Sequence, residues 1–239
     1  MMGNELTAEK YIVGHWKAKK VYNNLAAPKH QDRLQKCAEL TRGSRLADVG
    51  CAFGHSTAIM QDFRPGNWRG FDLSATAITE ARKFFPDMEF DHFPNINSMH
   101  KNLARFKLDS IVCSEVLEHV ADDRSLVLAL WNAVSERVVF TTPSVKVNDP
   151  GHIRLYNEAM LEKLFEGIPH TLENTGLFWY IVCHKDADSI VHGSLGAVEA
   201  DAYLIPPDEE VEPVEVDDES EADEPFWRSN EEPNGSDDD

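Results

Sequence analysis

Small residues and two carboxylates occur at spacings that suit an adenosine-containing cofactor. Asp48 lies near the end of an apolar run, and Gly50, Ala52 and Gly54 follow it. Residues this small let the backbone come close to a bound molecule. About 20 residues later, Asp72 follows a second apolar run, where a carboxylate can accept hydrogen bonds from two ribose hydroxyls. Asp48 could organise an ammonium group of the ligand through water or a backbone turn.

A dinucleotide such as NAD would use the same part of a fold, but with a different fingerprint. That fingerprint is G-x-G-x-x-G, in which three glycines bring a helix N-terminus close to a pyrophosphate. Positions 50, 52 and 55 are Gly, Ala and His, so the third glycine is missing. The pattern therefore disfavours NAD.

A second group of polar side chains could hold a metal ion or move a proton. If residues 115–119 are helical, Glu115, Glu118 and His119 share one face. Two carboxylates and an imidazole suit Mg²⁺, Mn²⁺ or Zn²⁺, and His152 could complete the set. A structural alternative also fits the residues: Glu115 caps a turn and His119 packs at the mouth of a pocket. Arg154 could clamp a carboxylate or phosphate, or order its own loop through a salt bridge.

Apolar runs alternate with helix-length segments along most of the chain. This alternation predicts right-handed crossovers and a doubly wound, Rossmann-like α/β sheet, mostly parallel, with the last strand antiparallel. The predicted helices cover residues 6–24, 29–42, 55–63, 74–85, 122–135 and 157–166. The seven predicted strands lie at residues 45–49, 68–71, 88–90, 110–113, 137–140, 169–174 and 177–183.

The charge is concentrated in a C-terminal tail. The 239 residues carry a formal charge of −19, and residues 207–239 contain 16 acidic residues against one Arg. We expect four parts: N-terminal helices (1–42), the sheet domain (43–186), an extension (187–206) and a disordered acidic tail (207–239). The aromatic pair Phe226-Trp227 could dock on a protein partner, or the tail could simply be solvated.

The rest of the composition is ordinary for a protein of the cytoplasm. Outside the tail the charge is only −4, which disfavours a nucleic-acid substrate. No run approaches the 18 apolar residues or so that a membrane span needs. The four cysteines form no C-x-x-C pair, as is typical of free thiols in a reducing compartment.

Four segments, in order, resemble the class I S-adenosylmethionine (SAM)-dependent methyltransferases. Residues 46–54 (LADVGCAFG) are similar to that superfamily's acidic-x-Gly-x-Gly-x-Gly turn, with Ala52 in place of the middle glycine. Residues 108–120 (LDSIVCSEVLEHV) resemble its fourth-strand segment, and residues 139–143 (VFTTP) its fifth strand. The following GHIRLY, residues 151–156, is similar to the segment that precedes a helix in many members. The resemblance covers about residues 30–185.

The resemblance implies SAM as cofactor and a role for individual residues. Gly50, Ala52 and Gly54 would line its methionine part and Asp48 would support its amino group. Asp72, with the adjoining Leu73, would hold the ribose. Ser114 and Glu115 would lie beneath the sulfonium. The catalytic candidates are Glu115, His119 and His152, and Arg154 is the candidate substrate contact.

The resemblance also implies an activity and leaves alternatives open. The expected reaction is methyl transfer to an oxygen or nitrogen, less readily a carbon, of a small-molecule, lipid or sugar acceptor. The set Glu115, Glu118, His119 and His152 resembles the metal-binding Glu-x-x-Glu-His of quinone-biosynthesis O-methyltransferases and small-RNA 2′-O-methyltransferases. A metal-dependent RNA methyltransferase is therefore one alternative. The other is a catalytically silent binding module whose working part is the acidic tail.

Overall fold

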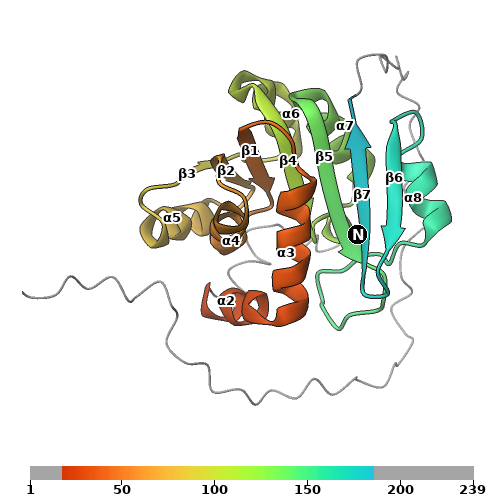
Figure 1. Ribbon diagram of the computed structural model, residues 1–239, viewed down its shortest axis with the longest axis horizontal. Coiled ribbons are helices and arrows are strands. Elements are labelled where there is room, and N and C mark those ends of the chain that lie inside the picture. Colours follow the sequence, from red (N-terminus) through yellow and green to blue (C-terminus); the bar gives the residue numbers. More distant parts are fainter. Residues whose placement is uncertain (1–17, 186–239) are drawn as a thin grey trace, which may run out of the picture. The chain divides into compact units, whose positions relative to one another are not determined.

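A seven-stranded sheet lies at the centre of the molecule, with helices on both faces (Figure 1). The computed structural model describes residues 18–185. The strands are β1 Arg45–Val49, β2 Asn67–Asp72, β3 Glu89–His92, β4 Leu108–Ser114, β5 Val134–Pro143, β6 His170–Asn174 and β7 Phe178–His184. The helices are α2 Ala18–Ala26, α3 Pro28–Leu40, α4 His55–Phe63, α5 Ala75–Phe84, α6 Ile96–Asn102, α7 Asp123–Ala133 and α8 Glu158–Leu164. Two short 3₁₀ helices, η1 Leu103–Phe106 and η2 Leu117–His119, complete the elements.

The strand order β3-β2-β1-β4-β5-β7-β6 confirms the predicted doubly wound architecture. Strands β1 to β5 pair in parallel, whereas β7 runs antiparallel to both β5 and β6. The order reverses at β1, so the carboxyl ends of β1 and β4 flank a topological switch point. Open α/β sheets bind their ligands at such a point.

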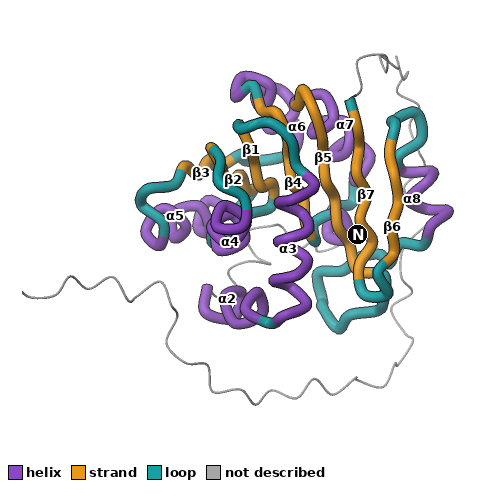
Figure 2. The backbone as a smooth tube through the Cα atoms, viewed as in Figure 1, coloured by secondary structure: helices purple, strands orange, loops and turns teal. Residues whose placement is uncertain are grey.

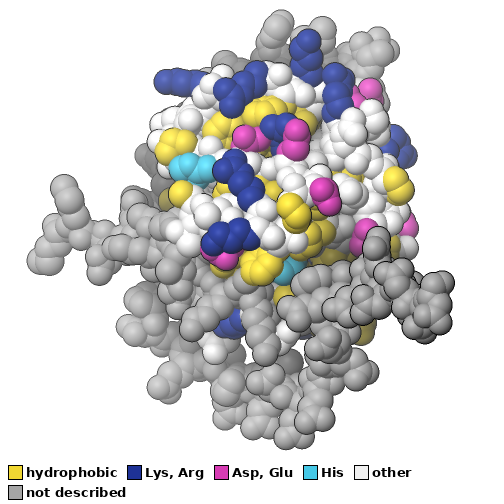
Figure 3. Space-filling model, turned by 90° about the vertical axis from the view of Figure 1, so that its left-hand side faces the viewer, with side chains coloured by type: hydrophobic (Ala, Val, Ile, Leu, Met, Phe, Trp, Pro, Cys, Tyr) yellow, Lys and Arg dark blue, Asp and Glu magenta, His cyan; other side chains and the backbone are white. Residues whose placement is uncertain are grey.

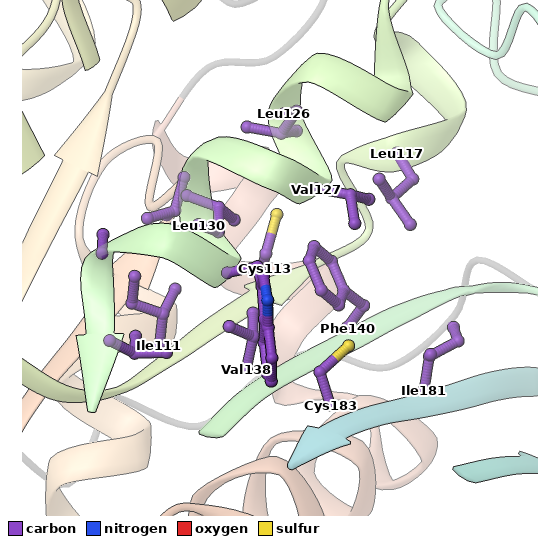
Figure 4. Close-up of a cluster of buried hydrophobic side chains, with 14 of the residues drawn as sticks. Ile111, Cys113, Leu117, Leu126, Val127, Leu130, Val138, Phe140, Ile181 and Cys183 are labelled. Carbon is purple, nitrogen blue, oxygen red and sulfur yellow. The ribbon is translucent and has the colours of Figure 1, made fainter. Parts of the chain in front are cut away.

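Alternate residues of the central strands fill two cores. In β4, Ile111 and Cys113 pack with α7, while Val112 between them packs with α3. Figure 4 shows the first of these cores, in which Leu126 and Leu130 of α7 lie over the sheet. Burial on both faces explains why these strands are continuous apolar runs rather than alternating ones. Figure 2 shows α3 crossing the other face of the sheet.

Most predicted boundaries agree with the structure to within a few residues, with two exceptions. β5 begins at Val134, directly after α7, and not at residue 137. Helix α6 was not predicted, because within it only Met99 is buried and the other residues show no apolar periodicity. Its start is marked by Asn95, whose side chain accepts a hydrogen bond from the Ser98 N–H.

Several sequence predictions lie outside the described residues. These are the first part of the N-terminal helices, the extension at 187–206, the acidic tail at 207–239 and its Phe226-Trp227 motif. Over residues 18–185, 20 Lys and Arg balance 20 Asp and Glu. Within this part of the chain, no helix has the length and apolar character to cross a membrane.

The face near β3 and α5 carries both charges. Arg69 forms ion pairs with Glu89 and Asp91 at this edge of the sheet. Figure 3 shows positive side chains on this side of the molecule with negative and apolar ones between them. The view therefore shows no uniformly basic surface.

Candidate active site

The turn between β1 and α4 forms the first half of the site. Gly50, Ala52 and Gly54 all have positive φ, at 85°, 45° and 83°. A Cβ on Gly50 would lie 2.3 Å from a methyl group of Val116, so this position requires glycine. Ala52 adopts a left-handed conformation that costs a residue with a Cβ about 1 kcal/mol or more. The turn is therefore maintained by its surroundings, in part by the amides of Gly50 and Cys51, which both donate to the Phe71 carbonyl.

Asp72 at the end of β2 faces this turn. Its Oδ2 accepts the Ala52 N–H at 2.9 Å, and its Oδ1 accepts the Ser74 N–H at 2.7 Å. The side chain is buried, which raises the pKa of the carboxyl above its usual range. Each carboxylate oxygen has two lone pairs, so Asp72 keeps capacity for further hydrogen bonds. The structure thus brings together the two halves of the predicted cofactor site.

Asp48 supports the turn from beneath. Its Oδ2 accepts hydrogen bonds from the hydroxyls of Ser56 and Thr57, at 2.7 and 2.8 Å, in the first turn of α4. Burial raises the pKa of Asp48 to about 6. Asp48 therefore fixes α4 against β1. It would affect a bound ligand indirectly, through the conformation of the turn at residues 50–54. Leu73, the neighbour of Asp72, packs against the core.

The carboxyl ends of β4 and β5 form the other side of the site. The hydroxyls of Ser114 and Thr141 are 2.7 Å apart, and Thr141 donates to Glu115 Oε1 at 3.0 Å. Glu115 Oε2 lies 3.0 Å from the Nη1 of Arg33, a residue of α3 that is almost fully buried. Arg33 was not recognised in the sequence, where it appears as one of several charged residues in a predicted helix.

The expectation that Glu115 shares a helical face with Glu118 and His119 is wrong. Glu115 has a positive φ of 58°, and only Leu117–His119 form a 3₁₀ turn. The buried strand ends in a sharp bend, because the chain must leave the sheet edge there. This bend directs Glu115 to Arg33 and separates it from the two later residues.

Glu118, His119 and His152 do come together. Their potential ligand atoms all lie within 4.8 Å of one another. The rings of His119 and His152 meet edge to face, with centroids 4.7 Å apart. Glu118 Oε2 accepts a hydrogen bond from the Thr142 hydroxyl at 3.1 Å. Its Oε1 lies 3.9 Å from His152 Nε2 and has no hydrogen-bond partner among the described residues.

The electrostatics of this trio favour a cation. Glu118 is 1% exposed, and burial together with the nearby Glu115 charge raises its pKa well above the usual range. Burial lowers the pKa of His119 to about 4 and also lowers that of His152, so both imidazoles are neutral near pH 7. A buried carboxylate oxygen without a partner is costly, and a cation between it and two neutral imidazoles would offset that cost. The trio therefore fits a divalent metal ion.

Arg154 orders the loop in which it lies. Its guanidinium is buried and contacts Asp123 Oδ2 at 2.5 Å. The same group donates to the carbonyls of Val120 and Ala121, at 2.8 and 3.0 Å. These contacts join the loop after β5 to the start of α7. The structure thus shows the loop-ordering salt bridge that the sequence also allowed, and the substrate contact at Arg154 stays a prediction.

His55, the first residue of α4, predicts a pH dependence of stability. Its ring is packed among Tyr22, Phe84 and Phe85, and burial lowers its pKa to about 4 from an ordinary 6.5. The His55 ring therefore binds a proton more readily in the unfolded chain than in the folded one. The neutral His55 ring contributes its full share of the free energy of unfolding above pH 6.5. This contribution is lost as the pH falls towards 4.

We expect His55→Phe to flatten this dependence. Between about pH 7.5 and about pH 5, the wild type should lose about 2 kcal/mol more unfolding free energy than the variant. Urea unfolding at both pH values measures the difference. His100→Gln, at an exposed histidine of α6, is the control. Equal losses in the wild type and His55→Phe would show that the buried ring is not the source.

Comparisons with known proteins agree with this geometry. Residues 47–140 match the family described as "Methyltransferase domain". An O-methyltransferase family protein from Burkholderia thailandensis is 13% identical, with a TM-score of 0.61, covering 77% of this chain and 64% of that one. A SAM-dependent methyltransferase from Archaeoglobus fulgidus is 14% identical, with a TM-score of 0.57, covering 71% and 100%. The magnesium protoporphyrin IX methyltransferase of Synechocystis PCC 6803, solved with bound SAH, is 16% identical, with a TM-score of 0.50, covering 66% and 83%. No curated protein sequence matches the chain.

Fold and site together define a Rossmann-like methyltransferase domain. The family match over residues 47–140 and the fold shared with SAM-dependent methyltransferases support the predicted class I superfamily, with SAM as the cofactor. The roles of individual residues remain predictions.

Proposed function

We propose that the protein transfers a methyl group from SAM to an oxygen or nitrogen of a small-molecule, lipid or sugar acceptor. The observation that carries this proposal is the contact between Asp72 and the turn at residues 50–54. The Ala52 N–H to Asp72 hydrogen bond joins a turn that can accommodate a ligand to a carboxylate that can accept ribose hydroxyls. Both lie at the topological switch point of the sheet.

The chain's own residues would mainly position the reactants. SAM supplies a methyl group that its sulfonium already activates. Asp72 would hold the ribose, and the backbone of Gly50, Ala52 and Gly54 would line the methionine part. Ser114 and Glu115 would form the floor below the methyl group, where Thr141 fixes both side chains. Holding two reactants in attack geometry can supply several kcal/mol of the rate enhancement, about 7–11 in favourable cases.

The proposal includes a divalent cation held by Glu118, His119 and His152. Two imidazoles favour Zn²⁺ or Mn²⁺ over Mg²⁺, which prefers oxygen ligands. Glu115 is not part of this set, because Arg33 and Thr141 already occupy its carboxylate. A cation here would lower the pKa of an acceptor hydroxyl. Without a cation, the neutral imidazoles of His119 and His152 could accept that proton only as weak bases, because burial lowers the pKa of both.

The charge distribution supports a small acceptor rather than RNA. The described residues are neutral overall, and nucleic-acid binding generally needs a basic surface. We place the protein in the cytoplasm because all four cysteines are buried free thiols, as is usual in a reducing compartment.

Titration calorimetry tests the cofactor assignment without knowledge of the acceptor. SAM and S-adenosylhomocysteine (SAH) are each titrated into the full-length protein, and both should bind one molecule per chain. Transfer of labelled methyl from SAM to a cell extract then identifies the acceptor. If neither SAM nor SAH binds, the proposed function is wrong.

A further inference from the structure

An ion pair between α3 and the end of β4 lies next to the cofactor turn. Nη1 of Arg33 is 3.0 Å from Oε2 of Glu115. The residue after Glu115 lies against the turn, because a methyl group of Val116 would be 2.3 Å from a Cβ on Gly50. The strands that lead into these two segments, β1 and β4, are paired neighbours in the sheet. The charges of the pair are therefore close enough to act on a bound cofactor.

The two charges of this pair differ in their exposure. The Arg33 side chain is only 5% exposed, and its guanidinium lies over the ring of Phe178, with Cζ 4.9 Å from the centroid. The Glu115 side chain is 22% exposed. A ligand can therefore approach the negative end of the pair, whereas protein covers the positive end.

Glu115 is held by contacts to its backbone and to its carboxylate. Its φ is 58°, and its N–H donates to the Thr141 carbonyl at 2.9 Å. The Thr141 hydroxyl donates to Oε1 at 3.0 Å, while Arg33 contacts Oε2. A carboxylate with both oxygens in contact has little freedom to turn. Its electrostatic field is therefore oriented before the cofactor binds.

The cofactor loses one positive charge at its sulfur atom during the reaction. SAM carries a sulfonium, whereas the product SAH carries a neutral thioether. The ammonium and carboxylate groups of the two molecules are the same. A fixed carboxylate near the sulfur atom therefore stabilises bound SAM and has little effect on bound SAH.

We infer that the Arg33–Glu115 pair makes the cofactor site select SAM over SAH. Glu115 provides the negative charge that attracts the sulfonium, and Arg33 opposes this charge from its buried position. Transfer of the methyl group then weakens the binding of the cofactor product and favours its release. The inference rests on the proposed function, in which Glu115 lies below the methyl group.

Glu115→Gln tests the inference through two dissociation constants. SAM and SAH are each titrated into the full-length protein by calorimetry, at the same pH and salt concentration. Gln keeps the size of the side chain and can still accept the Thr141 hydrogen bond. SAM affinity should fall about tenfold, between the effects of one charge pair in water and near a protein surface. SAH affinity should stay nearly unchanged. An unchanged ratio of the two affinities would overturn the inference.

Arg33→Gln should change the ratio in the opposite direction. It removes the opposing positive charge, while Thr141 and the backbone still hold Glu115, so binding of SAM should be strengthened relative to SAH. Damage to the site would weaken SAM and SAH alike. Equal losses of both affinities in Glu115→Gln would therefore contradict selection by charge. If circular dichroism shows Arg33→Gln to be unfolded, the Glu115→Gln result alone decides.

The surface pair Lys36–Glu173 is the matched control. Lys36 lies on the same helix as Arg33, and its Nζ is 2.5 Å from Glu173 Oε1, with side chains 32% and 59% exposed. Lys36→Gln and Glu173→Gln remove the same two kinds of charge and should leave the ratio unchanged. If Glu173→Gln lowers the ratio as much as Glu115→Gln does, the overall charge of the protein is responsible and the inference is wrong.

Sinefungin separates the effect of charge from contact with the methyl group. This analogue of SAM has an amine-bearing carbon in place of the methylated sulfur, so it carries a positive charge but no sulfonium methyl. Its affinity should fall in Glu115→Gln as that of SAM does. If it follows SAH instead, Glu115 recognises the methyl group and not the charge, which contradicts the inference.

The same titrations distinguish this inference from the proposed function. If the wild type binds neither SAM nor SAH, the proposed function fails. If the wild type binds both and Glu115→Gln leaves their ratio unchanged, only selection by charge is rejected.

Discussion

Asp72→Ala is expected to weaken SAH binding by about 100-fold or more. In the proposed complex Asp72 accepts two ribose hydroxyls, and each hydrogen bond to a charged group contributes about 1.5–3 kcal/mol. The substitution also removes the acceptor for the Ala52 and Ser74 amides, so the turn loses its support. Titration calorimetry with SAH gives the ratio of dissociation constants directly.

Asp91→Asn is the matched control for this prediction. Asp91 lies on the neighbouring strand β3, where it pairs with Arg69 at the surface, so it should leave SAH affinity unchanged. Circular dichroism checks that Asp72→Ala remains folded. Asp72→Asn provides a variant of nearly the same volume. Wild-type SAH affinity in a folded Asp72→Ala protein would show that the cofactor does not bind at this carboxylate.

Glu118→Gln is expected to lower the affinity for Zn²⁺ by more than about tenfold. The amide keeps the size of the side chain but cannot lose a proton to give the negative charge that would bind a cation beside His119 and His152. The wild type should bind one Zn²⁺ per chain, and His152→Gln should weaken binding to a similar extent. Calorimetry with Zn²⁺ measures the affinity, and the visible absorption of bound Co²⁺ reports nitrogen and oxygen ligands.

Glu115→Gln distinguishes the trio from the four-residue set expected from the sequence. Because Glu115 contacts Arg33 and Thr141, its replacement should leave Zn²⁺ affinity nearly unchanged. If Glu115→Gln and Glu118→Gln weaken binding equally, Glu115 is a ligand after all and the three-residue metal set is wrong. If the wild type binds no divalent ion, the metal part of the proposed function is withdrawn.

The sequence predicted those parts of the site that depend on local patterns. Asp48, the small residues after it and Asp72 belong to strand–turn segments, whose apolar runs and glycines are visible over a few residues. All three residues of the trio were among the predicted metal ligands, because Glu118 and His119 are close in the sequence and His152 belongs to a recognisable motif. Glu115 was misplaced because a helical spacing was assumed where the strand ends in a left-handed residue.

The remaining features depend on contacts between distant segments. Arg33 meets Glu115 across more than 80 residues, and α3 reaches Phe178 from the other end of the domain. Charged residues are common on predicted helices, and their sequence does not show which one the fold will bury. The partner of Arg154, Asp123, likewise belongs to a different element, so the sequence left open whether Arg154 orders its loop or contacts an acceptor.

Two adjacent threonines at the end of β5 link the reaction sites. Successive side chains of a strand point to opposite faces, so Thr141 and Thr142 extend to different sides. Thr141 holds Glu115, and through it Arg33, whereas Thr142 holds Glu118. A single peptide unit thus joins Glu115, with its contact to Arg33, to the metal trio. A ligand that binds better to one position of this peptide than to another must change the binding affinity on both sides of β5. The change is reciprocal. The apparent Zn²⁺ affinity should therefore depend on the SAH concentration, and the SAH affinity on Zn²⁺ by the same factor.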